Sequence, residues 1–377
     1  MANVVEFWSS VELGPFAPAL ICALGDAGLR AELRFAVSAE QYRAARGRLT
    51  RARLRWQLYG AYPLHLQARL RRPPLPAAIV VCTNTFYAPA AAIRATHAVG
   101  VPVVHWVFDL FPDVLAAEGA IAARGLIHDG LARLTRWTFD HAAANVFLGE
   151  KLRAHAEQSF GPIPRAHVIP VGADGQMFRA ATPQPRPSSQ PLRVLYCGNF
   201  GRMHDTDAVM GLLAEQVAPP WTIEFRGHGA GLRRVAATAA SRPWVRFAES
   251  VGTAEWSDVM KDADLALVTL KSGAEGLVMP SKTYSAMVAG QAIVAVCPAS
   301  SELADTVERH EAGWVVEPGR ADQLAAALHE AAGRPDELLR RRRNAFRAGH
   351  ELYAETALKE RWATLLTQVM DAAKQDR

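Results

Sequence analysis

The sequence predicts an α/β protein built from two Rossmann-like domains, each a doubly wound parallel sheet. Short apolar runs rich in β-branched residues alternate along the chain with longer Ala- and Leu-rich segments, as in parallel strands joined by helices. The chain has 377 residues, of which 50% are hydrophobic, and this allows about two domains with a core in each. Residues 179–192 contain four prolines, interrupt the alternation and are expected to form an interdomain linker.

The first alternating series is assigned to an N-terminal domain, residues 1–178. Its predicted strands are Asn3–Trp8, Glu32–Val37, Ala78–Cys82, Val101–Phe108, Asn145–Leu148 and His167–Val171. The helical segments between them include Pro18–Gly28, Ala88–Val99 and Gly130–Ala143. Strands separated in this way by helices imply a parallel sheet with helices on both faces.

The second series is assigned to a C-terminal domain, residues 193–350. Its predicted strands are Arg193–Cys197, Thr222–Arg226, Val245–Phe247, Leu265–Thr269, Ala292–Val296 and Gly313–Val316. Its predicted helices are His204–Glu215, Ala230–Ala240, Thr253–Ala263, Lys282–Ala289, Ser301–Glu308 and Ala321–Ala332. A last amphipathic helix is predicted over Pro335–Ala373, and we expect residues 351–377 to cross back to the first domain.

Composition excludes several classes of protein. No apolar run reaches the ~18–20 residues needed to cross a bilayer, and the N-terminus lacks the pattern of a secretory signal. The four cysteines are far apart and form no CxxC motif, which argues against a zinc ribbon or a dithiol redox site. We therefore expect a cytoplasmic protein with reduced cysteines.

The net charge of +5 comes from the first half of the chain. Residues 1–175 hold 18 Lys/Arg and 13 Asp/Glu, whereas the remainder holds 24 of each. No acidic residue occurs between Glu40 and Asp109, a stretch that contains ten arginines. Such a stretch favours a polyanionic partner. The later run Arg340–Arg343 is expected to be a solvated helix face.

Within this basic stretch, residues 41–60 are predicted to form one amphipathic helix. Its apolar stripe follows spacings of three and four residues: Tyr42, Ala45, Leu49, Ala52, Trp56 and Tyr59. The arginines of Arg43–Arg55 surround the stripe, as in helices that lie on an anionic membrane surface. The main alternative is an ordinary packed helix with a solvated arginine face. Nucleic-acid binding is disfavoured, because no recognised module is present.

Two glycine-bearing turns follow strands in the second half. The first is Gly198-Asn199-Phe200-Gly201-Arg202, and the second is Gly227-His228-Gly229. A turn of this kind lets backbone N–H groups approach a phosphate near a helix N-terminus, and Arg202 adds a planar fork for phosphate oxygens. The alternative is that both turns are only tight strand-to-helix connections.

The segment Gly273–Gly290 carries a stronger signal. Pro280 is expected near the first helical position, and Ser281 is expected to cap the helix. Lys282 then falls in the first turn, where its charge opposes the helix dipole. A bound di-anion would remove this conflict, so we interpret Lys282 as a phosphate ligand rather than a solvated surface lysine.

These segments, in this order, resemble the nucleotide-sugar domain of retaining glycosyltransferases of the GT-B fold, family four (glycosyltransferase group 1). The branch they resemble builds bacterial capsule, exopolysaccharide and O-antigen sugars. The resemblance rests on Tyr196–Arg202, Arg226–Gly229, Ala263–Val268, Pro280–Gly290, Ser301–Asp305 and Glu311–Gly319. In the first half, His105–Asp113 resembles the branch's strand-to-loop segment with its Asp-aromatic-Pro signature. The resemblance covers most of residues 75–370.

The resemblance implies roles for the matching residues. The expected catalytic residues are Arg202 and Lys282, on the donor pyrophosphate, and Asp109, near the sugar and the acceptor. The residues expected to line the donor site are Gly14, Gly198, Asn199, Gly201, Gly227, His228, Val251, Glu275, Gly276, Leu277, Val278 and Ser281. Among them, Gly276–Val278 match a loop whose amides face the donor sugar, and Val251 matches the region that flanks the nucleobase.

The chain departs from the family pattern at three places. Many relatives carry two glutamates eight positions apart around the donor loop, where this chain has Leu277 and Ser285, with Glu275 two positions away. Many carry a histidine in place of Phe108; His105 lies three residues earlier, on the opposite face of the predicted strand. The N-terminal glycine loop is reduced to residues 12–15.

The resemblance implies transfer of a hexose-type sugar from a nucleotide diphosphate sugar to a lipid-linked saccharide, with retention, in cell-surface polysaccharide biosynthesis. Arg202, Lys282 and loop amides would stabilise the charge that grows on the leaving diphosphate. We expect no cofactor and no essential metal ion, a lipid-linked acceptor, and a peripheral location on the inner face of the plasma membrane. A nucleotide-sugar epimerase of the same fold and a non-catalytic partner subunit are the alternatives.

Overall fold

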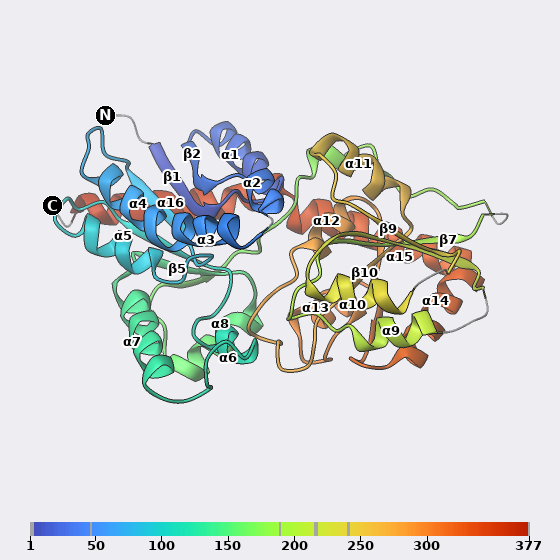
Figure 1. Cartoon of the computed structure of the whole chain (residues 1–377). Helices are drawn as coiled ribbons and strands as arrows, with labels where there is room; N and C mark the ends of the chain where they lie inside the picture. The colour runs from blue at the N-terminus through green and yellow to red at the C-terminus, as the bar shows by residue number, and fades with distance from the viewer. Residues whose placement is uncertain (1–3, 46, 188–189, 215–217, 240–241, 376–377) are drawn as a thin grey trace. The chain divides into compact units, whose positions relative to one another are not determined.

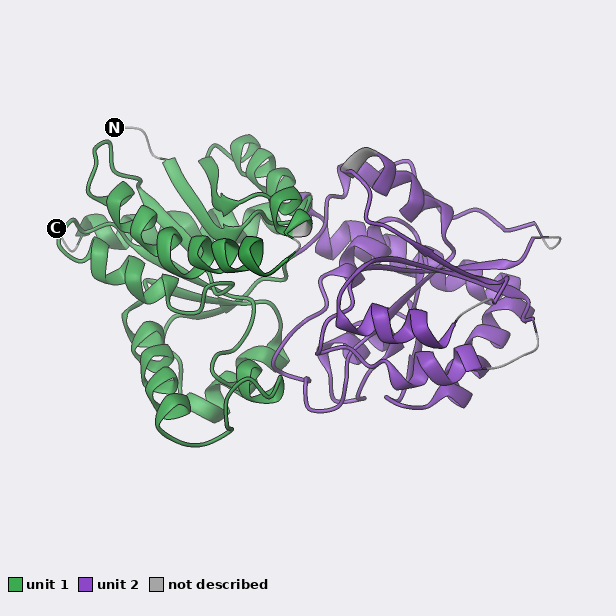
Figure 2. Cartoon of the chain, viewed as in Figure 1, with its two compact units in different colours: residues 1–171, 358–377 green, residues 172–357 purple. Residues whose placement is uncertain are grey.

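The structure is a computed structural model that describes residues 4–45, 47–187, 190–214, 218–239 and 242–375. The chain divides into two compact units (Figure 2): unit 1, residues 1–171 with 358–377, and unit 2, residues 172–357. Four residues of the predicted elements, Asn3, Arg46, Glu215 and Ala240, lie outside the described residues.

The described residues of unit 1 form a six-stranded parallel sheet in the order β2-β1-β3-β4-β5-β6 (Figure 1). Its strands are β1 (Val4–Val11), β2 (Arg30–Val37), β3 (Ala78–Cys82), β4 (Val103–Val107), β5 (Ala144–Phe147) and β6 (Ala166–Val168). Its helices are α1 (Phe16–Asp26), α2 (Ala39–Ala44), α3 (Arg48–Trp56), α4 (Tyr62–Leu70), α5 (Ala88–Thr96), α6 (Asp113–Ala117), α7 (Leu126–His141) and α8 (Glu150–Phe160).

Both faces of the central strands of unit 1 are buried. On one face, Trp8 and Ile79 pack with Leu66 of α4 and Ile93 of α5 in a single apolar cluster. On the other face, Trp362 of α16 (Glu355–Gln375) lies 5.6 Å from Phe7 and 5.0 Å from Trp106, measured between ring centroids. The C-terminal helix therefore completes the core of unit 1.

The described residues of unit 2 form a second six-stranded parallel sheet, in the order β12-β11-β10-β7-β8-β9. Its strands are β7 (Leu192–Asn199), β8 (Trp221–His228), β9 (Val245–Ala248), β10 (Leu265–Thr269), β11 (Ala292–Val296) and β12 (Gly313–Val316). Its helices are α9 (Asp207–Ala214), α10 (Ala230–Thr238), α11 (Thr253–Asp262), α12 (Lys282–Val288), α13 (Glu302–Arg309), α14 (Ala321–Gly333) and α15 (Pro335–Ala348). This is the strand order of a Rossmann fold, and the two sheets confirm the predicted fold class.

Two long predicted helices are wrong in detail. The single helix expected over residues 335–373 is α15, a π-helical turn at Gly349–Tyr353, and then α16. The break falls at Ala354, whose backbone is extended and pairs with Ala173 while the Glu355 carboxylate accepts a hydrogen bond from the N–H of Gly175. Tertiary pairing therefore overrides local helix preference at this point.

The helix expected over residues 41–60 is also interrupted. Ser38 caps the N-terminus of α2 in a reciprocal capping box, α2 ends at Ala44, and α3 starts only after Gly47, which has a φ of 86°. A π-helical turn, Gln57–Ala61, then joins α3 to α4. Most of the predicted apolar stripe does not pack: Leu49 is 87% exposed and Trp56 is 65% exposed.

The run Arg340–Arg343 is a solvated helix face only in part: Arg340 and Arg343 are exposed, whereas Arg341 and Arg342 pack inward. Arg342 is buried, where its guanidinium pairs with Asp264 at 3.0 Å and donates to the Gly290 carbonyl at 2.9 Å. Arg341 lies over the ring of Trp314, at 4.5 Å from its centroid. Arg341 and Arg342 therefore attach α15 to the rest of unit 2.

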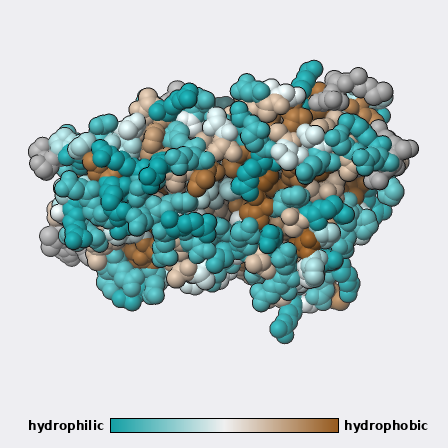
Figure 3. Space-filling model, turned by 180° about the vertical axis from the view of Figure 1, so that it is seen from behind, coloured by the Kyte–Doolittle hydropathy of each residue, from teal (hydrophilic) through white to brown (hydrophobic). Residues whose placement is uncertain are grey.

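The surface is predominantly polar on the face that Figure 3 shows, with apolar patches between the polar side chains. Within the described part of the chain, no helix combines the length and the apolar character that crossing a bilayer requires.

Candidate functional site

The candidate site lies at the carboxyl edge of the unit 2 sheet, where the strand order reverses between β7 and β10. In open α/β sheets this position is where ligands bind. The loops after β7, β8 and β10 and the start of α12 carry most of the residues that the sequence singled out.

Glycines allow the loops after β7 and β8 to touch. Gly198 and Gly227 are partners in the sheet register, and a Cβ on Gly227 would overlap the Gly198 carbonyl oxygen. A Cβ on Gly229 would likewise overlap the Phe200 carbonyl oxygen, and both glycines have positive φ. Hydrogen bonds from Phe200 N–H to the His228 carbonyl and from Gly231 N–H to the Phe200 carbonyl join the two loops. The glycines are thus explained first by close backbone packing.

Lys282 is the first residue of α12, as predicted, and its side chain turns toward the end of β7. Its Nζ donates to the Tyr196 hydroxyl at 2.6 Å and to the Asn199 carbonyl at 3.2 Å. Burial lowers the pKa of Lys282 to about 7. The Lys282 amino group therefore titrates near neutral pH, and an anion beside it would favour the charged form.

Two local predictions around Lys282 are wrong. The Ser281 side chain makes no capping hydrogen bond, because its own backbone is helical, with φ −58° and ψ −25°. Pro280 precedes this capping position and so lies outside the first helical turn. The start of α12 is thus left without a side-chain cap from Ser281.

Hydrogen bonds of His204 and Asp205 fix the turn after β7. The His204 ring donates through Nδ1 to the Thr269 carbonyl at 2.6 Å, and burial lowers the pKa of His204 to about 3, with a further effect from the Lys282 charge. Asp205 accepts from the N–H groups of Ala208 and Gly319 and so caps α9, which begins at Asp207 rather than at His204. Gly201 and the exposed Arg202 lie on this turn.

The loop after β10 is compact. Gly273 and Gly276 have φ values of 81° and 74°, and the N–H of Leu277 donates to the Ala274 carbonyl. The Leu277 side chain is buried, so it packs inside the loop. The Glu275 Oε2 atom is shielded from solvent and has no hydrogen-bond partner among the described residues. Val278 is partly buried in the same loop.

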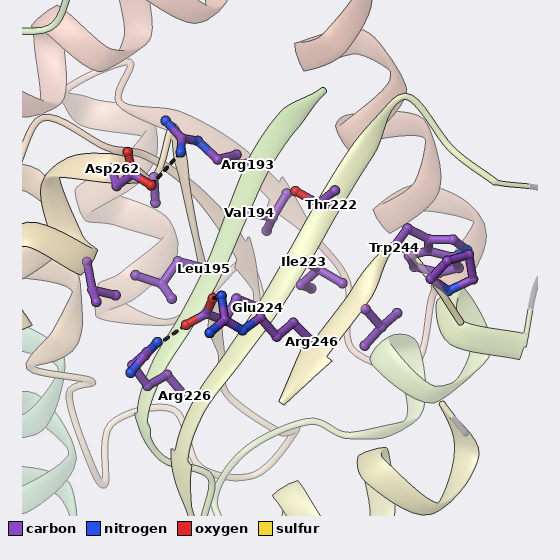
Figure 4. A pocket seen from close by; sticks show the side chains of 14 residues that line it. Arg193, Val194, Leu195, Thr222, Ile223, Glu224, Arg226, Trp244, Arg246 and Asp262 are labelled. Carbon is purple, nitrogen blue, oxygen red and sulfur yellow. Dashed lines mark hydrogen bonds and ion pairs between the residues drawn. The ribbon is translucent and has the colours of Figure 1, made fainter. Parts of the chain in front are cut away.

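The loop after β9 contains Val251, which is half-buried. Arg226 steadies this loop: its Nη1 donates to the Glu249 carbonyl at 3.3 Å, and its Nε pairs with Glu224 at 2.6 Å. Arg226 also lines a pocket of about 420 Å³ that extends over the face of β7, β8 and β9 rather than at the strand ends (Figure 4). Arg193 and Asp262 form an ion pair at the far side of that pocket.

Unit 1 holds Asp109 and Gly14. Asp109 follows β4, and its N–H bonds to the Thr83 hydroxyl at 3.1 Å; burial raises the pKa of its carboxyl to about 6, with a further rise from Glu118. Gly14 is exposed in the turn before α1. His105 bonds to Asn145 through Nδ1 and lines the same small pocket as Asp109, while the Phe108 ring stacks edge-on to Trp106.

Two residues of the site were not among those predicted. The Tyr196 hydroxyl accepts a hydrogen bond from the Lys282 ammonium, and the His204 ring bonds the turn after β7 to the end of β10. The signal in the sequence that could have indicated Tyr196 is a polar hydroxyl near the carboxyl end of a mainly apolar strand. Across the described residues, no group of three or more His, Cys, Asp or Glu side chains is arranged to hold a metal ion.

These two sheets, with a Rossmann strand order in unit 2, define a GT-B protein. Residues 191–333, most of unit 2, match the family model "Glycosyl transferases group 1". The chain is 26% identical over 246 residues to a probable glycosyltransferase, WbjE, of Pseudomonas aeruginosa; the match covers 62% of this chain and 60% of that relative. The similarity to glycosyltransferases of group 1 therefore lies mainly in unit 2.

Solved structures share the fold over nearly the whole chain. Sucrose-phosphate synthase of Thermosynechococcus elongatus aligns with a TM-score of 0.75 at 15% identity, over 98% of this chain and 100% of that one. HepE of Anabaena, solved in complex with UDP-glucose, aligns with a TM-score of 0.69 at 15% identity, over 97% and 99%. These likenesses confirm the GT-B fold.

Proposed function

We propose that the protein is a glycosyltransferase that moves a sugar from a nucleotide diphosphate sugar to a saccharide acceptor, with retention of configuration, as in family 4. The observation that carries this proposal is Lys282. It is a half-buried cation at the start of a helix, beside two glycine-bearing turns, in the unit that matches glycosyltransferase group 1. A diphosphate is the ligand chemistry that this arrangement suits best.

The chemistry follows from the charge of the leaving group. As the bond between the anomeric carbon and the diphosphate breaks, negative charge grows on the diphosphate oxygens. Lys282 and the exposed Arg202 would stabilise this charge more in the transition state than in the ground state, together with the amides of Gly201 and Gly276. These groups do the work of a divalent ion, so we propose that no metal is essential.

Glu275 supplies a plausible contact with the sugar or ribose hydroxyls. Its Oε2 is shielded and has no protein partner in the described part of the chain, which leaves it able to accept a hydrogen bond from a hydroxyl group. Leu277 is buried and cannot replace the glutamate of the family pattern. We therefore assign the hydroxyl-binding role to Glu275.

The acceptor is proposed to be a lipid-linked saccharide of a cell-surface polysaccharide, with Asp109 near the reacting sugar. The surface of α3 supports a membrane location: none of its residues is buried, and Leu49 and Trp56 are exposed beside Arg48, Arg51 and Arg55. Apolar side chains flanked by arginines suit an anionic lipid surface. We propose peripheral attachment on the cytoplasmic face of the plasma membrane.

The test begins with binding. A thermal-shift series with UDP- and GDP-sugars should find one donor that stabilises the protein, and Arg202→Ala or Lys282→Ala should remove that stabilisation. Incubation with the donor alone separates the reactions, because an epimerase converts the donor's sugar without an acceptor. NMR of the product of transfer should show the donor's anomeric configuration. A nucleotide shift that survives both substitutions would refute the site.

A further inference from the structure

Tyr196 is a buried tyrosine whose ring stacking and hydrogen bond fix the orientation of its hydroxyl group. Its ring stacks on Phe200, with centroids 4.2 Å apart and an interplanar angle of 16°. Its hydroxyl donates to the Asn199 carbonyl at 3.0 Å. Burial raises the pKa of Tyr196 well above its ordinary value, so the hydroxyl stays neutral and keeps its proton.

Because that proton is directed at Asn199, a lone pair of the Tyr196 hydroxyl is left for Lys282. Lys282 Nζ lies 2.6 Å from this oxygen, 3.2 Å from the Asn199 carbonyl oxygen and 4.2 Å from the centroid of the Tyr196 ring. An ammonium group has three N–H donors, and these two acceptors take two of them. No third acceptor for Nζ is present among the described residues, so one donor remains for an anion.

We infer that Tyr196 is a positioning residue, whose hydroxyl and ring keep the Lys282 ammonium charged and directed at the diphosphate of the donor. The inference rests on the proposed function and deepens it. It explains how a lysine can serve as a phosphate ligand in a place where burial disfavours its charge.

The other groups that face Lys282 do not supply this support. His204 packs edge-on to the Tyr196 ring, and its pKa of about 3 keeps it neutral. The Cys197 thiol lies close by, and burial raises its pKa, so it stays protonated near neutral pH; Arg226 of β8 interacts with this thiol. Cys197 has a raising electrostatic effect on the pKa of Lys282, whereas the hydrogen bonds that Nζ makes go to the Tyr196 hydroxyl and the Asn199 carbonyl.

The first test measures the protonation of Lys282 without any ligand. The chain has six lysines, at positions 151, 261, 271, 282, 359 and 374, so protein labelled with ¹³C-lysine gives a simple NMR spectrum. Lys282→Arg identifies the resonance. Tyr196→Phe should lower the pH at which Lys282 titrates by about one pH unit, because a hydrogen bond to a charged group is lost. An unchanged titration would overturn the inference.

The second test measures nucleoside diphosphate binding by calorimetry at pH 5.5 and pH 8, with UDP and GDP as probes. Tyr196→Phe should weaken binding about ten-fold at pH 8 and less than about three-fold at pH 5.5, where Lys282 is charged in both proteins. Comparing the two proteins at each pH cancels the titration of the ligand. A loss of equal size at both pH values would mean a merely structural role and would overturn the inference.

Controls separate this inference from the proposed function. Tyr62→Phe removes the hydroxyl of another buried tyrosine, which has no hydrogen-bond partner among the residues that the structure describes, and should leave binding unchanged. In a Lys282→Arg background, Tyr196→Phe should lose its pH-dependent effect, because arginine keeps its charge unaided. If the natural protein binds neither nucleotide, the proposed function fails; if it binds and Tyr196→Phe behaves like Tyr62→Phe, only the inference fails.

Discussion

Replacing Lys282 with methionine should stabilise the protein and abolish tight nucleotide binding. Methionine is unbranched and only one atom shorter than lysine, and it removes a charge that burial disfavours. The pKa of Lys282 falls from an ordinary 10.5 to about 7. At ~1.4 kcal/mol per pH unit, holding the lysine charged below pH 7 costs the folded state on the order of a few kcal/mol.

The sign of the pH dependence follows from this difference. The unfolded chain protonates Lys282 below pH 10.5, whereas the folded chain protonates it only below about 7. The cost is therefore complete below pH 7, shrinks as the pH rises and vanishes above 10.5. Lys282→Met should be more stable than the natural protein by ~1–3 kcal/mol at pH 6, and the two should converge toward pH 10. The Tyr196 hydroxyl still donates to Asn199 in the variant, so no buried group is left unpaired.

Urea unfolding at pH 6 and pH 9.5, with and without the nucleotide, measures both effects. A ligand at one hundred times its Kd stabilises the natural protein by ~2.7 kcal/mol. Loss of one charge-assisted contact, ~1.5–3 kcal/mol, removes most of that stabilisation in Lys282→Met. Lys261→Met is the control. Lys261 is exposed on α11, and its ion pair with Asp258 is long, at 3.8 Å, so the substitution should change stability by less than ~0.5 kcal/mol. A Lys282→Met protein that is less stable at pH 6, or that still responds fully to the nucleotide, would refute the reasoning.

Further expectations concern other parts of the site and surface. Gly227→Ala should destabilise the protein by roughly 2–4 kcal/mol in urea unfolding, because its Cβ would overlap the Gly198 carbonyl oxygen, whereas Gly252→Ala, which has open space, should be neutral. Equal effects of these two changes would contradict the packing argument. Asp109 should lose its charge as the pH falls through about 6, so sugar transfer should fall below pH 6 in the natural protein, while Asp109→Asn should have low activity that is independent of this pH range. An unaltered pH profile in the Asp109→Asn protein would remove Asp109 from the mechanism. Arg51→Gln with Arg55→Gln should weaken binding to phosphatidylserine vesicles by about 2 kcal/mol, or roughly 30-fold, in sedimentation assays. Arg233→Gln with Arg234→Gln, an equal loss of exposed charge on α10, should have little effect, and equal losses from both pairs would argue against α3 as the membrane surface.

Much of the fold could be predicted because its signals are local. The strand Leu265–Thr269 was predicted with the bounds that β10 has, since an uninterrupted run of apolar and β-branched residues is typical of a strand buried on both faces. The two long helices failed for the opposite reason. Nothing local in residues 335–373 indicates that Ala354 will pair with Ala173, which lies far away in sequence.

The candidate site was predictable to a similar degree. The sequence placed Lys282 at the first turn of a helix, and the structure has it there. It placed Gly198 and Gly227 after neighbouring strands, whereas both lie within the ends of β7 and β8, as partners in the register. It left open whether these glycines contact a ligand or only form tight connections, and the structure shows that two backbones meet at them. For Leu277 the sequence predicted only that its amide faces the donor; that its side chain is buried was decided by the folded loop.

The sequence by itself determined the α/β class, the two alternating series, the glycine-bearing turns and the lysine at the start of α12. Each depends on the order of residues within a short window, which is where strand, turn and helix preferences act. Only the tertiary structure decided that Lys282 meets Tyr196, 86 positions away, and that Arg342 is buried against Asp264. It also decided that Leu49 and Trp56 are exposed rather than packed. These outcomes depend on which segments, distant in sequence, pack against each other and exclude water. That packing determines how far the pKa of Lys282 shifts and which carboxylate Arg342 pairs with.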